Sequence, residues 1–280
     1  MLITKTIDET RAQVELGIAK GLKIGFVPTM GALHQGHISL ITKAKTENDL
    51  VVASIFVNPT QFNDPSDLTN YPKTPEQDHS ILKKNGCDIL FEPSADEIYE
   101  SSYVPPSFDF GSLEQTMEGA HRPGHFKGVA MVVYRLFQII PAHRAYFGEK
   151  DFQQLAIIRK MVEDQKLPIQ IIACPTIREA DGLAMSSRNI RLTDQERKLA
   201  PVIFESLMEC KELINSKGVS ELKKAVSKKI EGTGVFKIEY VEIADAQTLQ
   251  PIEGEDQQRQ IRVFIAAKAS KTRLIDNMDL

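Results

Sequence analysis

Two histidines in a glycine-rich stretch are the residues of this sequence with the clearest capacity for chemistry. His34 and His37 lie three residues apart, and Gly31 and Gly36 stand close to them. On a first helical turn, side chains at this spacing lie on the same face, so both imidazoles can reach one ligand. A glycine backbone also lets a phosphate or a planar base approach closely. The stretch therefore predicts an anion site, and a structural turn with two solvated histidines is the alternative.

Zinc binding is a further alternative for the two histidines. A tetrahedral zinc site needs additional cysteine, histidine or carboxylate ligands. The neighbourhood of the pair offers no cysteine or carboxylate at ligand spacing. The sequence therefore favours a phosphate-binding role over a zinc site.

The elements around the histidines predict how they are held. The apolar run from Leu22 to Val27 ends at Pro28, which is typical of a buried strand. After the turn, apolar residues recur at helical spacing, at Ile38, Leu40, Ile41 and Ala44. A helix that begins near Gly36 has unpaired backbone N–H groups with partial positive charge in its first turn. We therefore expect a strand, a turn and a helix, with the histidines at the start of the helix.

Two further segments place polar side chains after predicted strands. Asn58 and Gln61 follow the apolar run from Leu50 to Val57, at the strand end where ligands bind in open α/β sheets. Lys150 and Gln154 lie four residues apart at the start of a predicted helix, so both can face one crevice. An ordinary solvated first turn explains this second pair equally well.

Two loops are also candidates for the site. The segment from Arg178 to Asn189 is rich in hydroxyls and arginine, and these groups suit phosphate oxygens. His121 and His125 are close in sequence, but Pro123 and Gly124 between them exclude a regular helical pair. We therefore expect both segments to be loops.

The order of the predicted elements indicates the fold class. Apolar strands and helices alternate through the first 175 residues or so, as in an α/β fold with a doubly wound parallel sheet. Strands are expected at residues 22–27, 50–57, 87–91, 144–147 and 167–173, with helices at 8–20, between 75 and 86, at 126–140 and at 149–164. After this point a long helix capped by Thr193, a shorter helix and two alternating strands are typical of a small α+β domain. We therefore expect two domains, residues 1–176 and residues 177–280.

Composition narrows the class of partner. The 280 residues are 42% hydrophobic, and the net charge of -4 argues against a nucleic-acid surface. The three cysteines are widely separated, which predicts free thiols and a reducing compartment. No charged and apolar leader begins the chain, and Arg135 and Gln138 interrupt its longest apolar stretch. We expect a cytoplasmic protein that binds small molecules, without a membrane or nucleic-acid partner.

Five blocks of this sequence, in this order, resemble the pantoate:beta-alanine ligases, also called pantothenate synthetases. These ligases belong to the nucleotidylyltransferase superfamily, which carries a His-x-Gly-His signature. The signature alone is weak, but five blocks in the family's order make a chance match implausible. The blocks cover residues 28–37, 56–62, 122–126, 148–154 and 178–189.

The resemblance implies both a fold and a reaction. The fold is a Rossmann-like domain with a smaller C-terminal domain over the site, in a homodimer. The reaction is the ATP-dependent condensation of pantoate with beta-alanine to pantothenate. Pantoate first attacks the α-phosphorus of ATP to give pantoyl adenylate and pyrophosphate, and the amine of beta-alanine then displaces AMP.

The resemblance also assigns roles to residues at matching positions. Gln61 and Gln154 would bind pantoate, and Gln61 would also adjoin beta-alanine. His37 would donate a proton, with His34 and Lys150 as further catalytic groups. Magnesium would accompany ATP, but the resemblance does not assign its ligands. Asp78, in the predicted helix after the Gln61 loop, is the nearest acidic candidate, and a solvated helix face is the alternative for this residue. The ATP contacts would be Met30, Gly31, Ala32, Leu33, His34, Gln35, Gly36, His37, Gly148, Glu149, Lys150, Asp151, Ile177, Met185, Ser186, Ser187 and Arg188.

Two other functions compete with the ligase reaction. One is a nucleotidylyltransferase that forms an activated phosphate ester and stops there, and Gln61 and Gln154 argue against it because they suit a carboxylate substrate. The other is a non-catalytic nucleotide-binding protein, which the intact His34, His37 and Lys150 argue against. The sequence therefore favours the ligase.

Overall fold

The computed structural model describes residues 1–63, 65–100, 102–252 and 260–280 of the chain. The chain forms two compact units. Unit 1 contains residues 1–110, 122–149 and 154–175, and unit 2 contains residues 111–121, 150–153 and 176–280. The last change of unit falls within a residue of the predicted domain boundary, whereas the two short segments of unit 2 that interrupt unit 1 carry no signal in the sequence.

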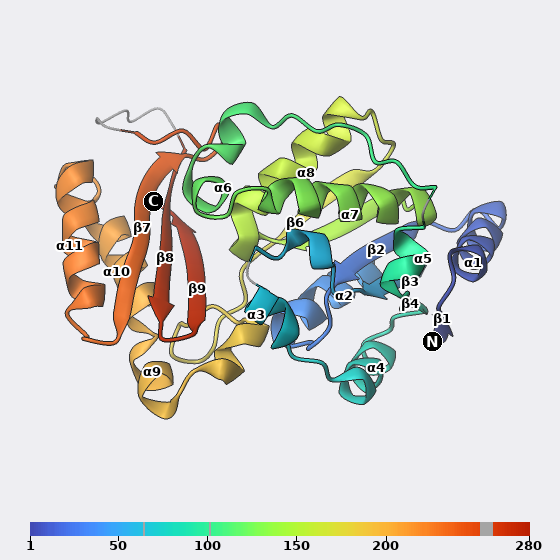
Figure 1. The fold of residues 1–280 in the computed structure, drawn as a ribbon, viewed down its shortest axis with the longest axis horizontal. Helices are drawn as coiled ribbons and strands as arrows, with labels where there is room; N and C mark the ends of the chain where they lie inside the picture. The colour runs from blue at the N-terminus through green and yellow to red at the C-terminus, as the bar shows by residue number, and fades with distance from the viewer. Residues whose placement is uncertain (64, 101, 253–259) are drawn as a thin grey trace. The chain divides into compact units, whose positions relative to one another are not determined.

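Unit 1 is built on a parallel sheet of six strands, as Figure 1 shows. The strands lie in the order β1-β4-β3-β2-β5-β6. Their bounds are Leu2–Thr4 for β1, Ile24–Thr29 for β2, Leu50–Ile55 for β3, Ile89–Phe91 for β4, Arg144–Gly148 for β5 and Gln170–Cys174 for β6. The predicted parallel α/β sheet is confirmed. The sequence prediction lacked β1, because three residues are too few to show a periodic pattern.

The connections between the strands create a switch point beside β2. From β2 the chain proceeds to β3 and then β4 on one side, and it later returns to add β5 and β6 on the other side. Strands β2 and β5 are therefore neighbours, but the chain that leaves the carboxyl end of β2 and the chain that leaves the carboxyl end of β5 run to opposite sides of the sheet. Ligands of open α/β sheets bind at such a point.

Helices cover both faces of this sheet. Helix α1 packs against α7 and helix α2 packs against α4, so each pair forms a layer. The longer helices of unit 1 are α1 (Ile7–Ala19), α2 (Gln35–Glu47), α4 (Pro75–Lys84) and α7 (His125–Ile139), with α8 (Phe152–Asp164) after β5. The shorter ones are η1 (Pro59–Gln61), α3 (Pro65–Thr69) and α5 (Ala95–Ile98). Within the described ranges, the search for a helix long and apolar enough to cross a membrane finds none.

The start of α4 lacks the side-chain cap that its sequence suggests. Thr74 and Gln77 have the spacing of a capping box, but the Thr74 side chain makes no cap hydrogen bond. Its hydroxyl donates instead to the carboxylate of Asp78, at 3.1 Å. A buried acceptor four residues away thus competes successfully with the backbone N–H groups of the helix.

Unit 2 contains an antiparallel sheet of three strands with helices against it (Figure 1). The strands are β7 (Phe236–Asp245), β8 (Ile261–Ala269) and β9 (Thr272–Asp279). Helices α10 (Val202–Leu213) and α11 (Val219–Glu231) contact each other and the sheet. The predicted α+β class is confirmed. The sequence prediction lacked β9, because its buried positions include the polar Asp276 and Asn277.

The long helix predicted after Thr193 is two helices. The predicted capping box is confirmed, because the Thr193 hydroxyl accepts from the Glu196 N–H and the Glu196 carboxylate accepts from the Thr193 N–H. Helix α9 (Asp194–Leu199) then ends before Pro201, and α10 begins after it. Proline lacks the N–H that would continue the helical hydrogen bonds, so the break follows from its chemistry.

Short helix α6 (Met117–His121) is tied to the sheet of unit 2 by a partly buried ionic cluster around Glu118. The Glu118 carboxylate accepts two hydrogen bonds from the Arg273 guanidinium, at 2.6 and 2.7 Å, and one from the Tyr240 hydroxyl at 2.7 Å. Arg273 also donates to Glu239 at 2.6 Å. Burial raises the pKa of Tyr240 well above its usual value, and Glu118 raises it further, so the phenol remains a donor.

Replacing Glu118 by glutamine is expected to destabilise unit 2 by about 3 kcal/mol, because the partly buried Arg273 guanidinium loses its bidentate partner. The Glu118 side chain is only 9% exposed, so water cannot substitute for the carboxylate. Urea unfolding followed by circular dichroism measures the change. The control is Glu221→Gln, which removes an exposed pair with Lys217 and should cost less than about 0.5 kcal/mol. Equal unfolding midpoints for the two variants would contradict the structural role of the cluster.

Candidate active site

The carboxyl ends of three neighbouring strands carry the predicted site residues of unit 1. Strand β2 lies between β3 and β5. It leads into the turn at residues 30–34, β3 leads into η1 with Gln61, and β5 ends at Gly148. Parallel strands end at the same edge of the sheet, so these three segments meet at the switch point. The sequence prediction that each of them follows a strand is confirmed.

The two histidines form a reciprocal cap at the start of α2. His34 is the N-cap residue, and its Nδ1 accepts from the Gly36 N–H at 3.1 Å. Nδ1 of His37 accepts from the backbone N–H of His34 at 3.3 Å, and the ring centroids are 4.1 Å apart. A ring nitrogen that accepts an N–H bond carries no proton, so in the neutral imidazoles the proton is on Nε2. Each ring is thereby oriented as an Nε2–H donor.

The backbone of the turn differs from the predicted anion site at a helix start. The N–H groups of Ala32 and Leu33 donate to the carboxylate of Asp78, at 2.9 and 2.8 Å. The N–H of Gly36 is bonded to His34. The protein's own side chains thus satisfy donors that a phosphate would need. The imidazole groups of His34 and His37 are therefore the candidates for anion recognition at this turn.

Gln61 is held in place by residues around it. Its Oε1 accepts from Nδ2 of Asn58 at 3.2 Å, and its Nε2 lies 3.0 Å from Sδ of Met30. Asn58 is 1% exposed, and its Oδ1 accepts from the Tyr99 hydroxyl at 2.7 Å. Burial raises the pKa of Tyr99 to about 12, so this hydroxyl remains a donor. The sequence suggests Asn58 as a substrate contact. In the structure it is buried, and it orients the Gln61 side chain through a hydrogen bond.

Gly128 of α7 allows the loop with Gln61 to lie against the helix. The Gly128 carbonyl accepts from Nδ2 of Asn58 at 3.1 Å. A Cβ at this position would lie 2.4 Å from the carbonyl oxygen of Thr60. Only a residue without a side chain fits this contact, and nothing in the local sequence marks it.

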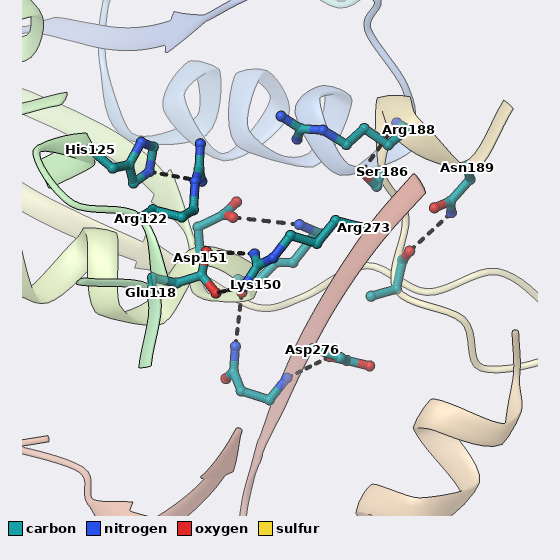
Figure 2. A network of polar contacts seen from close by, with 12 residues as sticks. Glu118, Arg122, His125, Lys150, Asp151, Ser186, Arg188, Asn189, Arg273 and Asp276 are labelled. Carbon is teal, nitrogen blue, oxygen red and sulfur yellow. Dashed lines mark hydrogen bonds and ion pairs between the residues drawn. The ribbon is translucent and has the colours of Figure 1, made fainter. Parts of the chain in front are cut away.

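His125 connects the same loop to Arg122, as Figure 2 shows for the two side chains. The guanidinium can only donate, so Nε2 of His125 accepts from Nη1 of Arg122 at 3.1 Å. Nδ1 of His125 then carries the proton and donates to the Gln61 carbonyl at 2.8 Å. The predicted loop from His121 to His125 is confirmed only for residues 122–124, because His121 is the last residue of α6 and His125 is the first residue of α7.

The predicted pairing of Lys150 and Gln154 on one helical face is wrong. Residues Glu149–Asp151 form a 3-10 turn, and α8 begins only at Phe152. Gln154 is half-buried in unit 1, whereas Lys150 belongs to unit 2. The neighbouring Gln153 is buried, and its amide donates to the carbonyls of Leu113 and Thr116. Sequence alone cannot tell which of the two adjacent glutamines is structural.

Lys150 is anchored within unit 2 by its backbone. Its carbonyl accepts from Nδ2 of Asn277 at 2.9 Å, and its Nζ lies 3.5 Å from Oδ1 of Asp151 (Figure 2). Asn277 is in turn fixed by its N–H, which donates to the carboxylate of Asp276. Strand β9 thus sets the position of a predicted catalytic lysine, and the sequence prediction lacked this strand.

The loop with the predicted phosphate contacts is a small closed structure of unit 2. The N–H of Met185 donates to the Ile177 carbonyl at 2.9 Å and closes the loop at its base. Beside the base, Arg178 forms a bidentate pair with the buried Asp276 of β9. The Arg178 guanidinium is therefore engaged in an ion pair inside unit 2. The arginine that the prediction assigns to phosphate is Arg188.

Two serines continue this loop. The Oγ of Ser186 accepts from the N–H of Arg188 at 3.2 Å, as Figure 2 shows. Ser187 begins a 3-10 helix, Ser187–Arg191. Local hydrogen bonds of this type fix the backbone that carries both serines and Arg188.

Asp78 does not fit the role of magnesium ligand. It is 1% exposed, and its two oxygens accept from the N–H groups of Ala32 and Leu33 and from the Thr74 hydroxyl. Magnesium keeps several water ligands and is usually held by one or two accessible carboxylates with substrate phosphates. Over the ranges that the structure describes, a search for three or more His, Cys, Asp or Glu side chains able to share an ion finds no such group.

Comparison with known proteins gives a consistent result. Residues 2–279 match the family model described as Pantoate-beta-alanine ligase. The pantothenate synthetase of Flavobacterium psychrophilum is 50% identical over 92% of both chains, and that of Porphyromonas gingivalis is 46% identical over 99% of both.

Solved structures agree with the sequence relatives. The pantothenate synthetase of Thermus thermophilus superposes with a TM-score of 0.92 at 40% identity, and the match covers 100% of this chain and 99% of that one. A pantoate-beta-alanine ligase from Francisella tularensis, complexed with beta-gamma ATP and beta-alanine, matches with a TM-score of 0.83 at 40% identity, over 100% and 97% of the two chains. The chain therefore belongs to the pantoate-beta-alanine ligase family.

Proposed function

We propose that the chain catalyses the ATP-dependent condensation of pantoate with beta-alanine to pantothenate, through a pantoyl-adenylate intermediate. The observation that carries this proposal is the histidine pair with oriented Nε2–H groups, in a chain that matches the ligase family over residues 2–279. The pair follows Met30 in the chain, and the Met30 sulfur lies 3.0 Å from Nε2 of Gln61. Its relative from Francisella tularensis is complexed with an ATP compound and beta-alanine, which supports the choice of substrates.

The first half-reaction transfers an adenylyl group. A carboxylate oxygen of pantoate forms a bond to the α-phosphorus of ATP, and the bond between this phosphorus and pyrophosphate breaks. Negative charge then accumulates on the departing pyrophosphate. Nε2–H donors of His34 and His37 stabilise this charge, and their fixed orientation means that little reorganisation is needed. By the resemblance, Lys150 and Arg188 offset the negative charge of the phosphates.

The second half-reaction forms the amide bond. The nitrogen of beta-alanine attacks the acyl carbon of the adenylate, AMP leaves with the electrons of the broken C–O bond, and the amine loses a proton. Gln61 and Gln154 bind pantoate through neutral amides. Because an arginine fork would engage both carboxylate oxygens, neutral amides leave them freer to attack phosphorus.

The remaining assignments rest on the resemblance. ATP contacts the turn at residues 30–37, the segment at residues 148–151, Ile177 and residues 185–188. Magnesium enters with the phosphates of ATP, where it supplies positive charge to the triphosphate. A homodimer and a cytoplasmic location are part of the same proposal.

An ordered assay tests this function. The protein is incubated with ATP, magnesium and pantoate, and beta-alanine is added afterwards while pyrophosphate and AMP are measured. The ligase should release pyrophosphate in the first stage and AMP only after the amine arrives. Pyrophosphate without amine-dependent AMP would indicate a nucleotidylyltransferase, and no release at either stage would indicate a non-catalytic nucleotide-binding protein.

A further inference from the structure

The turn between β2 and α2 has an unusual backbone. Gly31 has a φ of +81° and Ala32 a φ of +50°, so two consecutive residues lie in the left-handed region. Alanine enters this region only against a steric penalty, because its Cβ approaches the following carbonyl oxygen. Some other interaction must therefore hold the turn in this form.

The carboxylate of Asp78 provides this interaction. Consecutive N–H groups in such a backbone point into one concavity, which binds an anion. Here Oδ2 accepts from Ala32 at 2.9 Å and Oδ1 accepts from Leu33 at 2.8 Å. The Thr74 hydroxyl donates to Oδ1 at 3.1 Å and orients the carboxylate. Asp78 therefore occupies the anion site of the turn in this structure.

The same turn fixes the histidines. Leu33 is followed directly by His34, whose extended backbone forms the N-cap of α2 and receives the reciprocal cap with His37. A change in the backbone at Ala32 and Leu33 would shift the cap and both imidazole rings. Asp78 contacts neither ring in the hydrogen bonds described, so it would act through the backbone of the turn.

The geometry points to Asp78 as a positioning residue, which holds the turn so that the Nε2–H groups of His34 and His37 face the phosphates of ATP. This inference rests on the proposed function for the identity of the ligand. It replaces the magnesium role for which Asp78 is the nearest acidic candidate in the sequence.

Asp78→Asn tests the inference. Asparagine keeps one acceptor oxygen, but its NH₂ group is a donor and cannot accept from a backbone N–H. The turn therefore loses one of the two hydrogen bonds that Asp78 accepts from Ala32 and Leu33. Because small displacements of binding groups have large effects, the dissociation constant of magnesium-ATP should rise roughly 10- to 100-fold. Isothermal titration calorimetry without pantoate measures this binding in the absence of turnover.

The matched control is Glu76→Gln. Glu76 lies in the same first turn of α4 and is exposed, so this change removes the same charge from the helix start without touching residues 30–34. Its magnesium-ATP affinity should equal that of the wild-type protein. A comparable loss of affinity in both variants would show that charge alone is responsible and would overturn the inference.

Thr74→Val is a milder variant in case the asparagine protein does not fold. The Thr74 side chain does not cap α4, so its loss leaves the helix start unchanged while the carboxylate loses one donor. The dissociation constant of magnesium-ATP should rise roughly 2- to 5-fold, as expected for one hydrogen bond. Wild-type affinity in Thr74→Val and in folded Asp78→Asn would overturn the inference.

A measurement without ATP separates this inference from the proposed function. Nitrogen-15 NMR of the ligand-free wild-type protein should show both histidines in the neutral form protonated on Nε2. Asp78→Asn should lose this signature for His34, and Glu76→Gln should keep it. Unchanged signals in Asp78→Asn would overturn the inference, whereas failure of the wild-type protein to bind ATP would count against the proposed function alone.

Discussion

Replacing His37 by alanine is expected to slow pantoyl-adenylate formation by about 10²- to 10⁴-fold, with pantoate binding nearly unchanged. This is the usual range for the loss of a general acid or a preorganised donor. The effect should appear in the rate because the Nε2–H group stabilises charge that develops only as pyrophosphate departs. Rapid-quench measurement of pyrophosphate release in a single turnover gives this rate directly.

A second variant separates chemistry from folding. The side-chain oxygen of asparagine can replace Nδ1 of His37 as acceptor for the His34 N–H, but asparagine has no group at the position of Nε2. His37→Asn should therefore keep the cap and show the same loss as the alanine variant. Thr42→Ala, on an exposed position of the same helix, should keep full activity. Near-normal adenylate formation in His37→Asn would exclude the proposed role.

Lys150→Ala is expected to cause a loss of similar size, because the ammonium group offsets phosphate charge. Its backbone carbonyl still accepts from Asn277 after the substitution, so the local structure should persist. The same single-turnover experiment measures the loss. Activity within a factor of two of the wild-type value would remove Lys150 from the catalytic groups.

Replacing Gly128 by alanine is expected to destabilise unit 1 more than a glycine-to-alanine change at any other described glycine of this unit. The new Cβ would lie 2.4 Å from the Thr60 oxygen and 2.9 Å from the Cα of Gln61, and both are backbone atoms. Backbone cannot rotate away as a side chain can, so either the helix or the loop must move. We expect destabilisation of about 3 kcal/mol and a loss of about 10² in kcat/KM for pantoate.

Calorimetry and steady-state kinetics with varied pantoate check this prediction. For a unit of this size, 3 kcal/mol corresponds to a Tm decrease of roughly 6 to 12 °C. Gly218→Ala is the control, because nothing lies within 4 Å of the added Cβ and the glycine has a φ of -67°. A Gly128→Ala protein with normal Tm and normal KM for pantoate would show that the loop does not depend on this close approach.

The sequence by itself determined the layout of unit 1 and the location of its motifs. Apolar runs separated by amphipathic segments specify buried parallel strands and covering helices, because burial requires those periods. Residues that follow such strands meet at one edge of the sheet. The positions of His34, His37 and Gln61 at neighbouring strand ends follow from this local information.

Short elements and elements with buried polar residues could not be predicted from the local sequence pattern. Strand β1 has three residues, β9 buries Asp276 and Asn277, and the 3-10 turn before α8 changes which side chains share a face. None of these features has a distinct hydrophobic period. The predicted relation between Lys150 and Gln154 failed for this reason.

Only the tertiary structure decided which residues support the site. Asp78 holds the turn from 46 residues away, Gly128 accepts from Asn58 across 70 residues, and Asn277 reaches Lys150 across 127. The chemistry of these contacts depends on positions in space that no local pattern encodes. A carboxylate in a sequence can bind a metal, face solvent or satisfy a backbone, and the donors that the fold brings within 3 Å of Asp78 select the last of these.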